Sequence, residues 1–287
     1  MPELPEVETV RLQLLLKVRG KTIDQVTVYH SKTVAHDKTI GRKLKGLTIA
    51  GIDRVGKLLI WHFTDSAHHL LAHLKMTGQF LYVDSKQAVS GGGHTLSPTD
   101  TSLPNRHTRV AFHFVDGTTL YFNDMRLFGY TKIATPAQVA AARATFGPEP
   151  HDETFSVDNF ITGVRKRSAP IKAILLDQSF VSGLGNIYVD EALFRAGIRP
   201  TARGNTLSKP RLQKLAQAAG NILRESIAVG GTTFQHFADT GGERGNFTDY
   251  LRVFGKQNTP CRVCGAMITK IRCAGRGTHY CPTCQKP

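Results

Sequence analysis

The first part of the chain changes from a helical to an extended pattern of apolar positions. Near the N-terminus, apolar residues recur at three- and four-residue spacing, as on the buried face of a helix. The members of this stripe are Val7, Val10, Leu14 and Val18. Strand-like apolar runs follow at 58–63 and 110–115, and the Asp-Gly pair at 116–117 predicts a hairpin into one more strand. Residues 1–135 are therefore predicted to be β-rich behind one opening helix.

Beyond Gly147-Pro148-Glu149-Pro150 the spacing of apolar residues becomes helical. Helices separated by glycine and proline are predicted over 156–163, 170–177, 186–196, 208–228 and 231–238. A short strand is predicted over 249–254, and mobile surface loops over 90–104 and 241–246, which are rich in glycine and polar residues. The predicted parts of the chain are thus 1–135, 136–240 and 241–287.

The charge of the chain is strongly positive, with 37 Lys and Arg against 22 Asp and Glu, a formal net charge of +15. Such an excess favours a polyanionic partner, with nucleic acid first and an acidic membrane surface second. No apolar run approaches the roughly 20 residues of a membrane-spanning helix, and the acidic start differs from a basic, apolar secretion signal. We therefore expect an intracellular, cytoplasmic protein that works on nucleic acid.

All five cysteines lie near the C-terminus. Two Cys-x-x-Cys pairs, Cys261/Cys264 and Cys281/Cys284, flank 16 residues, and Cys273 lies between them. Two such turns complete the tetrahedral four-thiolate shell of a structural zinc ion. A redox-active pair and a set of reduced structural thiols are the alternatives, but the spacing favours one zinc ion. We expect that ion to hold the fold and take no part in chemistry, with Cys273 as a bystander.

The opening segment around Pro2 has two interpretations. It is a helix start, or, once Met1 is removed, it presents the secondary amine of Pro2. An α-amino group titrates at about pH 8, against about 10.4 for lysine, so far more of it is neutral and nucleophilic at physiological pH. Attack on a sugar carbon gives a cationic iminium, which promotes elimination, and Glu3 can supply a proton to the opened sugar or the departing base.

Three further positions are candidates for chemistry, and ordinary structural explanations exist for the first two. Lys57 follows a predicted hairpin turn, where a lysine is ordinarily a solvated charge. Asn186 follows a glycine-bearing turn whose main-chain amides can approach a phosphate, although a helix cap explains this residue as well. Arg276 lies on the turn between the two cysteine pairs, and from a rigid turn its side chain can reach into a groove. The basic residues upstream of Asn186 suit a surface that follows phosphates, and they are Arg165, Lys166, Arg167 and Lys172.

Taken together, these motifs resemble those of the bacterial formamidopyrimidine-DNA glycosylases, the enzymes that remove 8-oxoguanine. The resemblance covers nearly the whole chain, and the order and spacing of its motifs make coincidence implausible. The motifs are Met1-Pro2-Glu3-Leu4-Pro5-Glu6-Val7-Glu8, Gly56-Lys57-Leu58, His73-Leu74-Lys75-Met76-Thr77-Gly78, Leu184-Gly185-Asn186-Ile187-Tyr188, Gly230-Gly231-Thr232-Thr233 and the zinc tail.

The resemblance implies a role for each candidate residue. Pro2 is expected to attack C1′ and form the Schiff base, and Glu3 to act as the general acid at the sugar. Lys57 is expected to contact the phosphate on the lesion side and to assist β-elimination. Arg276 is expected to hold phosphate and to assist δ-elimination. Further contacts with DNA are implied for His107, Arg167, Lys172 and Asn186.

Met76, Arg126 and Phe128 match the residues with which the family fills the space left by an extruded base. Two apolar side chains can enter the gap in the stack while the arginine pairs with the orphaned cytosine. The alternative places Met76 and Phe128 in the core and Arg126 in a surface ion pair.

The implied fold is α+β, with an N-terminal β-sandwich and flanking helices, a helix-two-turn-helix domain and a four-cysteine zinc β-hairpin. The implied activity is that of a monomeric, bifunctional glycosylase and abasic-site lyase of base excision repair, acting on oxidised purines in duplex DNA. Two alternatives stay open: a non-catalytic binder of damaged DNA with this fold, and an endonuclease VIII-like glycosylase for oxidised pyrimidines. Asn246 departs from the family pattern in a region that helps cover the extruded base, which leaves the lesion preference open. Ser168 weakens the match around Arg167, and the role of the long 84–106 loop is open.

Overall fold

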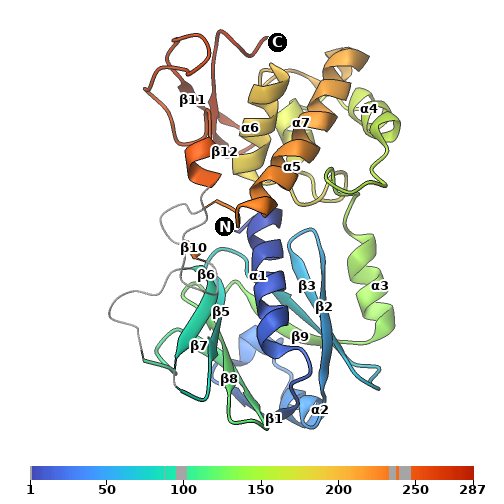
Figure 1. The fold of residues 1–287 in the computed structure, drawn as a ribbon. Helices are drawn as coiled ribbons and strands as arrows, with labels where there is room; N and C mark the ends of the chain where they lie inside the picture. Colours follow the sequence, from blue (N-terminus) through green and yellow to red (C-terminus); the bar gives the residue numbers. More distant parts are fainter. Residues whose placement is uncertain (1, 87, 95–101, 233–236, 239–246) are drawn as a thin grey trace. The chain divides into compact units, whose positions relative to one another are not determined.

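The computed structural model describes residues 2–86, 88–94, 102–232, 237–238 and 247–287 (Figure 1). The chain divides into two compact units. The first comprises residues 1–144 and 229–246, and the second comprises residues 145–228 and 247–287. The predicted division at 135 and 240 stays a prediction, because compact units and domains need not coincide.

Two antiparallel sheets form the centre of the first unit. One has six strands in the order β1-β7-β8-β5-β6-β10, and the other has four in the order β2-β3-β4-β9. The strands are β1 (Ile23–Val28), β2 (Ile49–Val55), β3 (Leu58–Phe63), β4 (His69–His73), β5 (Gly78–Val83), β6 (Val89–His94), β7 (Thr108–Phe114), β8 (Thr119–Asp124), β9 (Tyr130–Ala134) and β10 (Phe237–Ala238). The helices are α1 (Leu4–Val18), α2 (Ile40–Leu44), α3 (Pro136–Ala144) and the short 3₁₀ turn η1 (Ser31–Val34).

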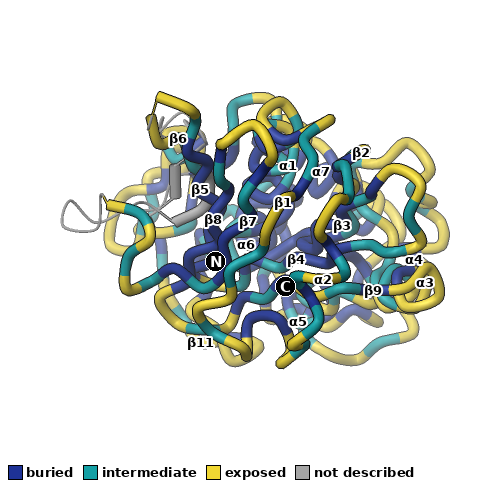
Figure 2. The backbone as a smooth tube through the Cα atoms, turned by 90° about the horizontal axis from the view of Figure 1, so that it is seen from below, coloured by how far each residue is buried: buried dark blue, intermediate teal, exposed yellow. Residues whose placement is uncertain are grey.

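One apolar core fills the space between these sheets and α1. The predicted stripe of α1 is buried in it, together with inward-facing residues of both sheets. Phe80 of β5 contacts Trp61 of β3 and Phe122 of β8, at ring-centroid distances of 5.6 and 5.0 Å. All residues of β5 are buried and appear dark blue in Figure 2. The expected β-sandwich behind an opening helix is therefore confirmed.

The glycine-rich start of the predicted 90–104 loop is a strand instead. Residues 89–92 pair with Val83–Phe80 of β5 in antiparallel register. A Cβ at Gly91 would lie 2.1 Å from Leu81 Cδ2, so the glycine permits a close approach between strands and does not mark a loop. Residues 95–101 of the predicted loop lie outside the described residues.

Two helices of the first unit were not predicted. Helix α2 has only five residues, too few to show a period. Helix α3 buries only Val139, so its sequence carries almost no apolar stripe.

The second unit is helical and ends in a β-hairpin. Its helices are α4 (Val157–Arg165), α5 (Ile171–Leu176), α6 (Asn186–Ala196) and α7 (Lys209–Ala228), with 3₁₀ turns η2 (Gly204–Thr206) and η3 (Phe247–Tyr250). The hairpin strands are β11 (Thr269–Cys273) and β12 (Arg276–Tyr280). Four of the five predicted helices are confirmed, and each of their ends lies within two residues of the predicted one.

Two predicted elements are wrong. The helix predicted over 231–238 is not formed where the chain is described, because Phe237 and Ala238 pair with His94 and Gly93 of β6. The strand predicted over 249–254 is replaced by η3 and a turn. There the carboxylate of Glu191 accepts hydrogen bonds from the amides of residues 252–254, which a strand would pair with a neighbouring strand. The predicted 241–246 loop lies outside the described residues.

Among the described helices, none has both the length and the apolar character needed to cross a lipid bilayer.

Candidate active site and nucleic-acid interface

Pro2 precedes a helix start that is held by two buried carboxylic acids. Glu3 is the residue before α1, and both Glu3 and Glu6 are only 3% exposed. The Glu3 amide donates to Glu6 Oε2 over 2.8 Å, and the Thr232 amide donates to Glu6 Oε1 over 2.7 Å. Glu6 therefore fixes the turn that carries Pro2 and Glu3. In the sequence Glu6 stands out only as a member of the opening motif, and no local signal names Thr232 as its partner.

Gly231 is required for this arrangement. Its φ of +84° lies in the left-handed region, and a Cβ there would come within 3.0 Å of Glu6 Oε1. The second glycine of the pair 230–231 thus has a physical reason in the close approach of the backbone to Glu6, whereas Gly230 has open space around it and a φ of +78°.

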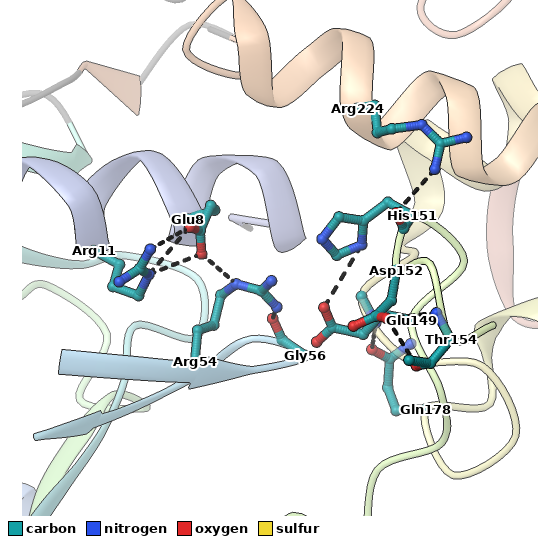
Figure 3. A network of polar contacts seen from close by, with 11 residues as sticks. Glu8, Arg11, Arg54, Gly56, Glu149, His151, Asp152, Thr154, Gln178 and Arg224 are labelled. Atoms are coloured by element: carbon teal, nitrogen blue, oxygen red, sulfur yellow. Dashed lines mark hydrogen bonds and ion pairs between the residues drawn. The ribbon is translucent and has the colours of Figure 1, made fainter.

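Lys57 lies in the turn between β2 and β3 and is 4% exposed. Arg54 supports this turn, since its Nη1 donates to the Gly56 carbonyl over 2.9 Å and its Nε to Glu8 Oε2 over 2.7 Å (Figure 3). Burial raises the pKa of Glu8, but hydrogen bonds and charges from Arg11 and Arg54 outweigh it and bring that pKa below its ordinary value. An ionised Glu8 on α1 thus anchors the turn that presents Lys57.

His73, at the end of β4, is a neutral imidazole near Lys57. Burial, together with the positive charges of Lys75 and Lys57, lowers the pKa of His73 to about 3. Its Nδ1 accepts a hydrogen bond from the Lys75 amide over 2.9 Å. In the sequence His73 appears only as part of a motif. Its burial beside two lysines is a property of the fold and cannot be seen in the sequence.

Acid should destabilise the protein through His73. Its pKa is near 6.5 when unfolded and about 3 when folded, so the unfolded state alone gains a proton as the pH falls from 6.5 toward 3. Between pH 7 and pH 5 the parent should lose about 2 kcal/mol more unfolding free energy than His73→Asn, in which Oδ1 replaces Nδ1 as acceptor. Urea unfolding at both pH values measures the difference. Equal losses in the two proteins would show that His73 does not titrate in this range.

Met76, Arg126 and Phe128 come together at the surface of the first unit. Arg126 Nη1 lies 3.1 Å from Met76 Sδ, and its guanidinium lies 4.8 Å from the Phe128 ring centroid. Met76 is 41% exposed and Phe128 is 49% exposed. Neither is therefore a core residue, and the exposed cluster has the apolar wedge and the hydrogen-bonding group expected of a void-filling trio.

A buried carboxylate that the sequence did not reveal supports this cluster. Asp124 is 1% exposed and accepts hydrogen bonds from Thr77 Oγ1, from the Arg126 amide over 3.1 Å and from the Gly129 amide over 2.7 Å. Leu127 in the same loop has a φ of +56°. Asp124 therefore holds both loops that carry the trio.

His107 lies in the turn before β7. Its amide donates to Asn105 Oδ1 over 2.9 Å, and its Nε2 accepts from Arg106 Nε over 3.1 Å. The side chain is half-buried. The predicted contact of His107 with DNA stays a prediction.

Arg276 lies on the hairpin of the second unit, next to the residue that Asn186 contacts. Arg276 is exposed and begins β12, after a turn in which Ala274 and Gly275 both have positive φ, the geometry of a tight two-residue hairpin. Asn186 begins α6, and its Nδ2 donates to the Gly277 carbonyl over 3.0 Å. Asn186 does not cap the helix, because Gly185 occupies the cap position.

Lys172 and Arg167 are not the free surface cations that a phosphate-tracking run suggests. Lys172 is fully buried, and its Nζ lies 2.6 Å from Asp190 Oδ1. Arg167 donates to the Gly163 carbonyl over 2.7 Å and stacks on Phe180, 4.1 Å from the ring centroid. The sequence shows the basic residues but not the groups that their side chains contact in the fold.

The four paired cysteines form a metal site of zinc geometry. The Sγ atoms of Cys261, Cys264, Cys281 and Cys284 all lie within 4.8 Å of one another, with Cys264–Cys281 at 3.4 Å and Cys261–Cys284 at 4.0 Å. A tetrahedral zinc shell with bonds of about 2.3 Å places sulfurs about 3.8 Å apart, so these residues fit a structural zinc ion. Cys273 lies outside the cluster, with Sγ 3.8 Å from the Pro200 carbonyl oxygen.

Comparisons with known proteins agree along the whole chain. Family models match residues 1–131 as the formamidopyrimidine-DNA glycosylase N-terminal domain, 146–238 as the H2TH domain of the same enzymes, and 259–287 as the zinc finger found in FPG and IleRS. The formamidopyrimidine-DNA glycosylases of Listeria monocytogenes (strain F2365) and Bacillus licheniformis are each 40% identical to the chain over 291 residues, which cover 100% of both chains in each case.

Solved structures agree with the sequence relatives. The Lactococcus lactis Fpg, in complex with DNA that contains an abasic site, has a TM-score of 0.88, 35% identity and 100% coverage of both chains. The same protein in complex with DNA that contains an oxidised pyrimidine has a TM-score of 0.87 with the same identity and coverage. The chain therefore belongs to the formamidopyrimidine-DNA glycosylase family of base-excision-repair enzymes.

Proposed function

We propose that this enzyme excises oxidised purines from duplex DNA and then cleaves the strand as an abasic-site lyase, with Pro2 as the nucleophile. The observation that carries the proposal is the anchored N-terminal turn, in which Glu6 holds the Glu3 amide and leaves Pro2 ahead of the helix. A nucleophile on a fixed turn meets the orientation that covalent catalysis requires. The net charge of +15 favours DNA as partner.

The proposed reaction starts at C1′ of an extruded nucleotide. The Pro2 nitrogen forms a bond to C1′ as the bond from C1′ to the base breaks, and the nitrogen loses its proton. The C1′–O4′ bond then breaks to give an iminium, and Glu3 donates the proton that the opened sugar or the departing base takes up. The resulting iminium acidifies C2′, so loss of a C2′ proton expels the 3′ phosphate. Loss of a C4′ proton then expels the 5′ phosphate. Lys57 and Arg276 hold the phosphates during these eliminations.

Met76 and Phe128 are proposed to enter the gap left by the extruded nucleotide, and Arg126 to bond to the opposite base. Their exposure and mutual contacts support this assignment. His107, Asn186 and the basic residues Arg165, Lys166 and Arg167 are proposed to contribute to the DNA surface. We expect the enzyme to act as a monomer on intracellular, nucleoid DNA.

Replacing Arg126 should relax discrimination of the base opposite the lesion. One good pair between a side chain and a base edge contributes about 1–3 kcal/mol of discrimination, so Arg126→Ala should reduce the preference for cytosine by roughly tenfold. Excision rates on duplexes with each of the four bases opposite 8-oxoguanine measure this preference. Arg143→Ala is the control, since Arg143 pairs with Asp53 away from the trio. An unchanged four-base ranking in Arg126→Ala would remove this residue from recognition.

Borohydride trapping on lesion-bearing duplexes tests the proposed function. Reduction of the iminium should join protein and DNA covalently, with a faster yield on 8-oxoguanine than on oxidised thymine. Tight binding without an adduct would favour a non-catalytic binder instead. The reverse substrate ranking would favour an oxidised-pyrimidine glycosylase, an alternative kept open because the Lactococcus lactis relative was solved with an oxidised pyrimidine in its DNA.

A further inference from the structure

Helix α6 buries two consecutive acidic residues that the proposed chemistry does not use. Asp190 is 0% exposed and Glu191 is 1% exposed. Glu191 accepts the amides of residues 252–254, on the segment that leads to the zinc site. Asp190 faces the hairpin. Burial of a carboxylate is unfavourable unless charge and hydrogen bonds compensate it, so the partners of Asp190 indicate its role.

The carboxylate of Asp190 joins three elements of the second unit. Its Oδ1 accepts a hydrogen bond from Lys172 Nζ of α5 over 2.6 Å. Its Oδ2 accepts one from the His279 amide of β12 over 2.8 Å, and His279 Nδ1 lies 3.6 Å from the same oxygen. Asp190 therefore attaches the strand that Arg276 begins to the helical framework.

Lys172 makes a second connection to the same strand. Its Nζ lies 3.5 Å from the Gly277 carbonyl, which also accepts from Asn186 Nδ2 over 3.0 Å. Gly277 is the residue directly after Arg276. Lys172 has no exposed surface, so its ammonium group bonds to protein partners and does not face a phosphate.

Zinc binding alone would fix only the end of β12 next to Cys281, which is the end away from Arg276. Arg276 is five residues before the ligand Cys281, which is roughly 16 Å at the rise of an extended strand. A hairpin of two strands is marginally stable by itself. The contacts at His279 and Gly277 lie between the metal and Arg276, where the hairpin has no other anchor of buried charge among the described residues.

We infer that Lys172 and Asp190 are positioning residues for Arg276: Lys172 pairs with the buried Asp190, and Asp190 sets the hairpin strand so that the guanidinium meets its phosphate. This inference rests on the role of Arg276 in the proposed function. It replaces the predicted direct contact of Lys172 with DNA. A double-mutant cycle distinguishes that contact from a positioning role.

The test compares Lys172→Met/Asp190→Leu in the parent and in the Arg276→Ala background. The paired change leaves no unpaired buried charge, so the fold is expected to persist. In the parent, δ-elimination on abasic-site DNA should slow roughly ten- to hundredfold, because misplacement of a phosphate-binding group by about 1 Å has that effect. In the Arg276→Ala background the same change should slow the residual δ-elimination less than about twofold, as expected for residues acting through Arg276.

An equal slowing in both backgrounds would overturn the inference, because it would mean that Lys172 acts on DNA independently. One zinc ion per chain and a cooperative thermal transition verify the fold. If the Leu variant fails that check, Lys172→Met/Asp190→Asn carries the same cycle, since its amide retains an acceptor for the His279 amide. If Arg276→Ala alone leaves δ-elimination unchanged, the proposed role of Arg276 fails instead, and the two failures are thereby distinguished.

Discussion

A chain that retains Met1 in front of Pro2 should cleave abasic-site DNA at least about a thousandfold more slowly than the processed enzyme. The retained residue converts the Pro2 nitrogen into an amide, which is not nucleophilic and cannot form an iminium. Borohydride-trapped adduct should disappear in parallel. A chain extended by a cleavable tag, assayed before and after proteolysis and checked by mass spectrometry, provides both states in one preparation.

Pro2→Gly is the matched control. Its primary amine can still form an imine, so measurable trapping should remain, whereas the extended chain should show none. The extended chain should bind DNA with about the same affinity as the processed enzyme, because its basic surface is unchanged. Wild-type cleavage by a chain proven to carry Met1 would exclude Pro2 as the nucleophile.

Loss of one exposed zinc ligand should disable DNA binding. Cys264 is exposed, so Cys264→Ala leaves no cavity in the core. Any effect of this substitution on DNA binding therefore comes from loss of the metal ion. A structural zinc site contributes about 10 kcal/mol or more to the folded state of small modules, and the hairpin β11–β12 is marginal without it. Zinc content should fall below one ion per chain, and the dissociation constant for abasic-site DNA should rise at least about a hundredfold.

Cys273→Ala is the control for that experiment. Cys273 is the one cysteine of the chain outside the two pairs, lies on β11 and is not part of the metal cluster. This variant should retain one zinc ion per chain and bind DNA as the parent does. Full zinc occupancy and parental affinity in Cys264→Ala would contradict the assignment of the site.

Elements with a regular buried stripe were predictable from the sequence. Helix α1 buries Val7, Val10, Leu14 and Val18, each at 1% exposure or less, and the Asp116-Gly117 turn joins β7 to β8 as expected. Strand β6 was not predictable, because the glycines that indicate a loop serve a close approach between strands that only the assembled sheet reveals.

The zinc site was predictable, because its chemistry is carried by residue type and spacing. The role of Pro2 stays a prediction. The residues that support the candidate active site were not predictable. Glu6 meets an amide 226 residues later, and Asp124 meets Thr77 from 47 residues away. Nothing local to an acidic residue identifies such a distant donor, and the same reasoning led to Lys172 being assigned to the surface when Asp190 holds it inside.

The carboxylate of Asp124 has a consequence for how the duplex is invaded. Thr77 follows Met76 on one loop, and Arg126 and Gly129 lie on either side of Phe128 on another, yet all three donors converge on this one side chain. Under the role proposed for the trio, the thioether, the phenyl ring and the guanidinium therefore enter the DNA together. On that proposal, separation of the stacked bases and inspection of the unpaired base are a single event.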